Sequence, residues 1–123
     1  MRIDYSIVFV SDMARSVAFY RDLLGIPLRF ESPEWTELAT EGATLALHAT
    51  DEPAPGGGED AGNPAGSARP GLAVPDLDGL HERLVAAGVR CVQEPTELHG
   101  ARLAQYLDPD GLRVSLSQDR ARG

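Results

Sequence analysis

The chain is poor in cysteine: Cys91 is the single one among 123 residues. An intramolecular disulfide is therefore excluded, and such usage is typical of proteins in a reducing cytoplasm. The sequence also lacks any apolar run near the ~18 residues of a membrane helix, so it predicts no membrane span. Its first residues, 1–4, hold no charged-then-apolar signal region. We therefore expect a protein of the cytoplasm.

Positive charge is scarce as well. Lys and Arg number 11 against 19 Asp and Glu, which gives a formal net charge of −8. Nucleic acids and anionic membranes are bound through clustered Lys and Arg, so this balance argues against both as partners. It is compatible with a cationic ligand, although acidic surface residues also keep ordinary proteins in solution.

Motifs of the common enzyme classes are missing. The sequence contains no Gly-x-Ser-x-Gly nucleophile elbow and no His-Glu-x-x-His zinc motif. The glycines at 56–58 are not followed by the Lys-Ser/Thr and helix of a phosphate-binding loop. We predict no catalytic residue, and a pair of His48 with a carboxylate is the one arrangement that would allow proton transfer without metal.

What the chain does contain is a repeated pattern. Residues 7–25 (IVFVSDMARSVAFYRDLLG) and 71–88 (GLAVPDLDGLHERLVAAG) each read as an apolar strand, an acidic helix cap, an amphipathic helix and a closing glycine. Asp12 caps the first helix, and either Asp76 or Asp78 caps the second. Short strands follow each helix, so the pattern is βαβββ twice and predicts an α+β fold of two equivalent modules.

This repeat sets the predicted boundaries. The first module spans residues 1–50, the second 69–118, and a tail follows at 119–123. Residues 51–68 (DEPAPGGGEDAGNPAGSA) are dense in Gly, Pro and acid, so they read as a flexible linker that either stays open or closes over a site as a lid. In the second module we expect strands at 69–74, 89–93, 101–107 and 112–118, with a loop at 95–100.

Three segments carry a resemblance to a known family. They are Ser11-Asp12 followed by SVAFYRDLLG at 16–25, Asp76-Leu77-Asp78 followed by AAGV at 86–89, and YLDPDG at 106–111. Together they resemble the vicinal oxygen chelate superfamily, which includes glyoxalase I, bleomycin-resistance proteins and extradiol dioxygenases. The resemblance implies that the two modules form curved mixed sheets, each shaped as a cup. It also implies a homodimer, and whether modules pair within or between chains stays open.

Enzymes of that family hold a divalent metal in the cup, on His or Glu side chains of the first and last strands of each module. In this sequence the corresponding positions carry Tyr5, His48, Arg69 and Ser115. Only His48 is of a type that ligates such an ion, and Arg69 would bring a fixed positive charge beside it. We therefore expect no metal and no other cofactor.

Strand alternation indicates which side chains line the cup, because neighbours two apart share a face. If Tyr5 points inward, Ile7 and Phe9 do so too, and Trp35 either stacks on a flat ligand or covers a sheet edge or subunit contact. The predicted ligand-binding residues are Tyr5, Ile7, Phe9, Trp35, Ala46, His48, Arg69, Tyr106, Arg113 and Ser115. This mixture of apolar walls and a few polar anchors is typical of a small-molecule pocket.

These observations predict a small-molecule binding protein, and the resemblance implies that it is closest to the bleomycin-resistance branch. It would confer resistance by sequestering an antibiotic, aromatic and compatible with a positive charge, without metal or turnover. One alternative is a metal-free isomerase, cyclase or lyase on the same scaffold, for which His48 is the discriminating residue. A metal-dependent enzyme of glyoxalase or dioxygenase type is a further alternative.

Overall fold

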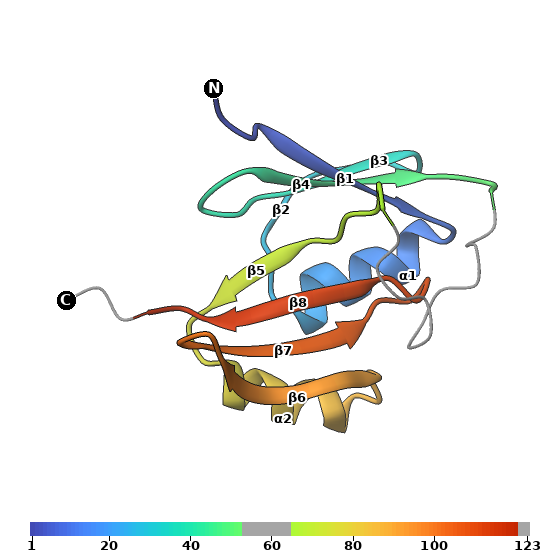
Figure 1. The fold of residues 1–123 in the computed structure, drawn as a ribbon. Helices are drawn as coiled ribbons and strands as arrows, with labels where there is room; N and C mark the ends of the chain where they lie inside the picture. The colour runs from blue at the N-terminus through green and yellow to red at the C-terminus, as the bar shows by residue number, and fades with distance from the viewer. Residues whose placement is uncertain (53–64, 121–123) are drawn as a thin grey trace. The chain divides into compact units, whose positions relative to one another are not determined.

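The computed structural model describes residues 1–52 and 65–120 (Figure 1). The chain divides into two compact units, Met1–Pro55 and Gly56–Gly123, which we name module one and module two. The division falls inside the predicted 51–68 linker. The expectations of a flexible linker or lid at 53–64, and of a tail at 121–123, lie outside the described residues.

Module one is a four-stranded mixed sheet with one helical segment. Its elements are β1 (Tyr5–Val10), α1 (Met13–Val17), a π-helical turn η1 (Ala18–Leu23), β2 (Leu28–Glu31), β3 (Trp35–Leu38) and β4 (Thr44–Ala49). The strand order is β1-β4-β3-β2, with β1 parallel to β4 and the other pairs antiparallel. Asp12 caps α1 as predicted, since its carboxylate accepts from the Arg15 amide.

Module two repeats this topology. Its elements are β5 (Gly71–Val74), α2 (Leu77–Ala86), β6 (Cys91–Leu98), β7 (Ala101–Leu107) and β8 (Arg113–Gln118), in the order β5-β8-β7-β6 with β5 parallel to β8. Of the two candidate caps for α2, Asp76 is the one used, because its side chain accepts from the Gly79 amide. The predicted α+β fold of two βαβββ modules is confirmed.

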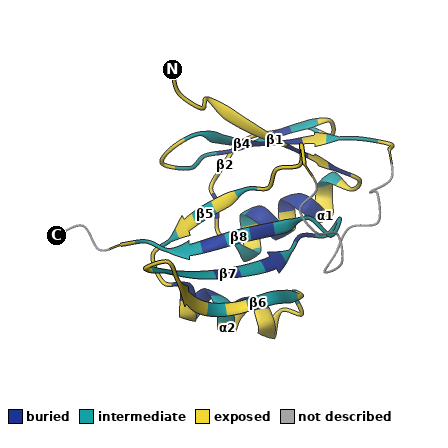
Figure 2. Ribbon diagram, in the orientation of Figure 1, coloured by how far each residue is buried: buried dark blue, intermediate teal, exposed yellow. Residues whose placement is uncertain are grey.

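One face of each sheet packs against the helix of its own module, and burial alternates along the strands accordingly (Figure 2). In module one the core contains Val8, Val10, Val17, Tyr20, Leu38, Leu45 and Leu47. In module two it contains Leu77, Leu80, Leu84, Ala104, Tyr106, Val114 and Leu116. Burial of these side chains is the main favourable term holding each helix on its sheet.

Two predicted strand boundaries are wrong. The strand expected from residue 69 begins at Gly71, so Arg69 precedes β5. The loop expected at 95–100 is largely strand, because β6 continues through Pro95 to Leu98. A proline is tolerated there since β6 is an edge strand, and the pairing of β6 with β7 shifts register on the N-terminal side of Thr96.

Within residues 1–52 and 65–120, no helix has both the length and the apolar character needed to cross a membrane.

The packing of α2 leads to a stability prediction. Leu84 is fully buried and its neighbour Val85 is half exposed. We expect Leu84→Ala to lower the free energy of unfolding in urea by about 2–5 kcal/mol, through lost burial and a cavity. Val85→Ala on the same helix should change it by no more than about 0.5 kcal/mol. Equal losses in the two variants would contradict the assigned orientation of α2.

Candidate functional site

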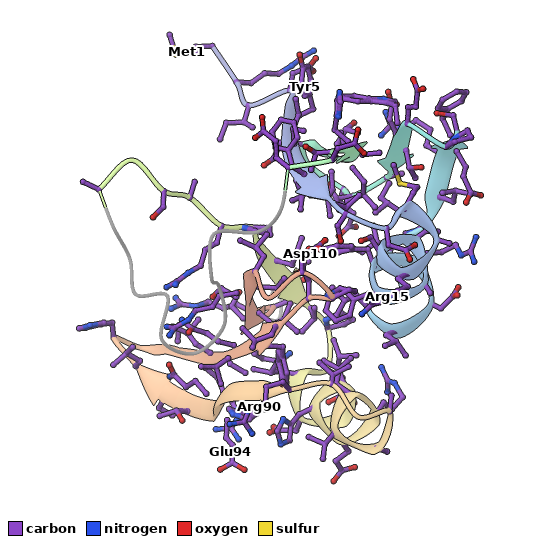
Figure 3. All side chains as sticks on the ribbon, turned by 90° about the vertical axis from the view of Figure 1, so that its right-hand side faces the viewer. Met1, Tyr5, Arg15, Arg90, Glu94 and Asp110 are labelled. Carbon is purple, nitrogen blue, oxygen red and sulfur yellow. The ribbon has the colours of Figure 1, made fainter. Side chains whose placement is uncertain are left out.

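The face of the module-one sheet opposite its helix carries large apolar side chains that remain exposed. On β1 these are Tyr5, Ile7 and Phe9, with 53%, 39% and 59% of their surface accessible; Tyr5 is labelled in Figure 3. Val8 and Val10, in the other phase of the strand, are buried. The alternation predicted for β1 is therefore present, and it leaves an unusual amount of aromatic surface uncovered.

The ladder register adds residues of β3 and β4 to this face. On β4, Ala46 pairs with Ile7 of β1 and His48 pairs with Phe9. On β3, Glu37 pairs with Ala46 and Trp35 pairs with His48. We name this set the aromatic face: Tyr5, Ile7, Phe9, Trp35, Glu37, Ala46 and His48. Six of the ten residues predicted to bind ligand are thus brought together within one module.

The rings of the aromatic face contact one another in series. Trp35 meets Tyr5 with ring centroids 6.3 Å apart and planes at 80°, and it meets His48 at 6.0 Å and 89°. His48 in turn lies 5.3 Å from Phe9 at a tilt of 46°. The two contacts of Trp35 are edge-to-face, an arrangement that contributes about 0.5–1.5 kcal/mol beyond simple burial, so they favour the observed ring positions.

Ala46 explains how Trp35 reaches Tyr5. The Cα atom of Trp35 lies in register with that of His48, whereas Tyr5 pairs with Thr44, about 13 Å farther along β4 at the usual strand rise. The side chains must lean along the strands to close this distance, and the methyl group of Ala46 between them leaves room for that. Ala46 is itself fully buried although it belongs to the open face, which fits such a covering.

Glu37 is a member of this face that is not among the predicted ligand-binding residues. The indole Nε1 of Trp35 donates to Glu37 Oε2 at 2.9 Å. The two residues are two apart on β3, so their side chains share a face, and that spacing is the signal that could have identified Glu37. A carboxylate thus stands among the rings.

His48 is exposed, and its Nδ1 lies 2.7 Å from the carbonyl oxygen of Ala49. Because a carbonyl only accepts hydrogen bonds, Nδ1 carries the proton of the neutral ring and Nε2 carries the lone pair. The imidazole can therefore accept a hydrogen bond, or a proton, at Nε2.

The open face of module two differs in chemistry. Arg113 and Ser115 alternate with the buried Val114 and Leu116, as predicted, and Ser115 lies in register with Gln105 and with Gly71. Polar and small side chains thus replace the rings of module one.

Arg69 is exposed and lies just before β5. Together with Arg113 and Ser115 it belongs to module two, so these three predicted residues are not members of the aromatic face.

Tyr106 does not lie on an open face, and its selection as a pocket residue is corrected. It pairs in register with the buried Val114, it is fully buried, and its hydroxyl lies 2.8 Å from Nδ1 of His81 on α2. Burial, reinforced by nearby acidic groups and Cys91, raises the pKa of Tyr106 well above its usual range, so the phenol stays neutral. No sequence signal pointed to His81 as its partner.

Comparison with known proteins gives the family. A sequence profile of the Glyoxalase/Bleomycin resistance protein/Dioxygenase superfamily matches residues 2–116. The chain belongs to this superfamily. Among curated proteins, none matches the sequence.

Solved structures of similar fold agree with this membership. TioX from Micromonospora sp. ML1 is 21% identical, with a TM-score of 0.73 over 96% of this chain and 98% of that one. A glyoxalase/dioxygenase from Nostoc punctiforme is 18% identical, with a TM-score of 0.80 over 98% and 92%. A lactoylglutathione lyase from Agrobacterium tumefaciens is 16% identical, with a TM-score of 0.69 over 94% and 92%. At these identities the likeness shows the fold alone.

The superfamily's metal positions can now be located by register. In each module the first strand pairs in parallel with the last strand. First-strand residues are equivalent when they lie the same number of residues before the helix cap, which is Asp12 or Asp76, and their partners on the last strand are then equivalent too. On this basis Ser115 corresponds to Ala46, and His48 corresponds to Ser117. The sequence alignment of His48 with Ser115 was wrong by two residues, which keeps the face but moves the position along the strand.

The corrected positions do not suit a divalent metal. They carry Tyr5, Ala46, Arg69 and Ser115, none of which supplies an imidazole, carboxylate or thiolate ligand. In the described parts of the chain, no three His, Cys, Asp or Glu side chains are grouped so that they could hold a metal ion. The residues present therefore do not fit the metal of the superfamily's enzymes.

The corrected position of Tyr106 is testable with a matched pair of tyrosines. Tyr106→Phe removes a buried hydroxyl that bonds His81, so we expect the free energy of unfolding to fall by about 0.5–1.5 kcal/mol. Tyr5→Phe alters a half-exposed ring and should change it by at most about 0.5 kcal/mol. Urea unfolding of both variants measures the difference, and the reverse order would contradict the placement.

Proposed function

We propose that the protein binds a flat aromatic small molecule on the aromatic face of module one and holds it without converting it. In biological terms this is sequestration of an antibiotic-like compound, the role expected of a bleomycin-resistance-like member of the superfamily. The observation that carries the proposal is the run of exposed or half-exposed rings in mutual contact, from Tyr5 through Trp35 and His48 to Phe9.

Exposed aromatic surface of this extent favours a binding role. Folded proteins seldom leave contiguous apolar patches in water unless the patch binds something. Rings already held in place lose little conformational freedom when a ligand stacks on them, which improves affinity. The few polar atoms among the rings, on Glu37 and His48, would orient the ligand, as in typical small-molecule sites.

The hydrogen bonds of Glu37 and His48 support binding without turnover. On β1, β3 and β4 the imidazole and carboxylate side chains that share the aromatic face are those of His48 and Glu37. Glu37 bonds Trp35, and the Nδ1 atom of His48 bonds a backbone carbonyl, so each has a structural contact. The unsuitable donor set at the superfamily's metal positions supports a role without metal.

The proposal includes a homodimer, following the superfamily resemblance. We expect light scattering coupled to size exclusion to give a mass twice that of one chain. Such an association could cover exposed apolar surface of module one, including Ile3 just before β1 and Leu28 and Phe30 on β2. A single-chain mass at micromolar concentration would contradict this part of the proposal.

Ligand titration tests the proposal. Trp35 is the only tryptophan, so intrinsic indole fluorescence reports this face alone. We expect at least one member of a panel of planar antibiotics to quench Trp35 and raise the melting temperature. A ligand at about a hundred times its Kd adds roughly 2.7 kcal/mol of stability. A broad panel that produces neither response would overturn the proposal.

A variant pair locates the binding surface. Trp35→Leu should weaken binding of the quenching ligand at least about fivefold by calorimetry, because stacking of a base-sized ring on an aromatic side chain is worth ~1–3 kcal/mol. Leu98→Ala, which shortens an exposed apolar residue of module two, is the control and should leave affinity unchanged. Equal effects would place the ligand elsewhere.

A second candidate is a metal-free enzyme, favoured by the lone pair on His48 Nε2. If His48 were a general base, His48→Ala should slow turnover by about 10²–10⁴-fold. In a binding protein the same variant lowers only the affinity. Mass spectrometry of ligand recovered after prolonged incubation decides between them: we expect unchanged ligand, and a product lost in His48→Ala would favour the enzyme.

A further inference from the structure

We infer that the ligand of the aromatic face is an organic cation, recognised jointly by the rings around Trp35 and by the carboxylate of Glu37. This inference rests on the proposed function, and it adds the charge of the ligand and a residue responsible for selecting it.

The arrangement of the rings suits a cation. Tyr5 and His48 both stand nearly perpendicular to Trp35, at 80° and 89°. Rings set at right angles present electron-rich faces in more than one direction, and this is how aromatic cages surround quaternary ammonium groups. A set of parallel rings would instead favour a neutral flat molecule inserted between them.

Glu37 supplies a fixed negative charge at the same place. Its Oε2 accepts from Trp35 Nε1 at 2.9 Å, and this is its only side-chain hydrogen bond to the described residues. A carboxylate accepts at both oxygens, so Oε1 can receive a further donor or lie against a positive charge. The bond also orders the carboxylate beside the indole, which reduces the entropy lost when a ligand binds.

The hydrogen bond strengthens the indole as a cation site as well. A carboxylate that accepts from the indole N–H polarises the ring and increases the electron density on its faces. Trp35 is already the side chain with the strongest attraction for cations among the aromatic residues. Trp35 and Glu37 therefore act together, one through its face and the other through its charge.

On β1, β3 and β4 no positive side chain lies beside the carboxylate, and on β2 the residue in register with Glu37 is the apolar Phe30. Of the residues that the register of β1, β3 and β4 places on the aromatic face, Glu37 is the charged one. The whole chain carries a net charge of −8, which further attracts cations and repels anions. An anionic aromatic ligand would be repelled by the charge of Glu37.

A matched pair of probes tests the inference. Acridine and 10-methylacridinium have nearly the same ring area, and at pH 8 the first is neutral while the second carries a fixed positive charge. We expect calorimetry to show 10-methylacridinium bound at least about tenfold more tightly than acridine, within the range of desolvated cation–aromatic and ion-pair contacts. The preference should shrink as sodium chloride is raised.

Two glutamate variants assign the preference to one residue. Glu37→Gln keeps an acceptor for Trp35 Nε1 but removes the charge, so the preference for the cation should fall about tenfold while acridine affinity stays within about threefold. Glu34→Gln changes the net charge equally at an exposed position just before β3, and it should retain the preference. Loss of preference in both variants would assign it to net charge and overturn the inference.

The outcomes separate the inference from the proposed function. Equal affinity for the two probes would overturn the cation inference and leave aromatic binding intact. Tighter binding of neutral acridine would likewise overturn the cation inference. An undiminished preference in Glu37→Gln would overturn the joint recognition by Trp35 and Glu37 that the inference states. Failure of both probes, and of every planar compound in the titration panel, would overturn the proposed function together with the inference.

Discussion

The alternation of side chains along a strand is the constraint on which the rest of the structure depends. In the described part of each module, one helical segment covers one face of a four-stranded sheet, and no described helix or strand of that module covers the other face. Aliphatic residues such as Val8 and Leu47 fill the covered face. Because they occupy one phase of the strand, the other phase is released from packing and can carry residues selected for recognition.

The two modules use this freedom differently. Module one presents rings and the carboxylate of Glu37, whereas module two presents Arg113, Ser115 and Gln105 at comparable places on β7 and β8. The superfamily's metal is not accommodated at either set of positions, and the proposed binding function uses stacking and charge in its place.

Much of the fold could be predicted, because helix caps, helical periodicity and closing glycines are signals within a short stretch of sequence. Each of these signals also occurs twice, once in each module. The failures concern relations between strands. The alternation of apolar and polar residues does not reveal a two-residue error in aligning β4 with β8, because such a shift keeps every side chain on the same face of the sheet. Tyr106 was assigned to the wrong face, although its phase follows from its pairing with Val114. Glu37 was passed over because acidic residues are common in this chain, and only its bond to Trp35 distinguishes it.

The central claim is that the aromatic face of module one is the surface that binds ligand. Side-chain chemical shifts of the aromatic rings, followed by NMR during titration with 10-methylacridinium, test it most directly. The account predicts progressive shifts for Tyr5, Phe9, Trp35 and His48, and constant positions for the buried rings of Tyr20 and Tyr106. Saturating ligand that moves the Tyr106 and His81 resonances, while those of Trp35 and Tyr5 stay in place, would contradict it.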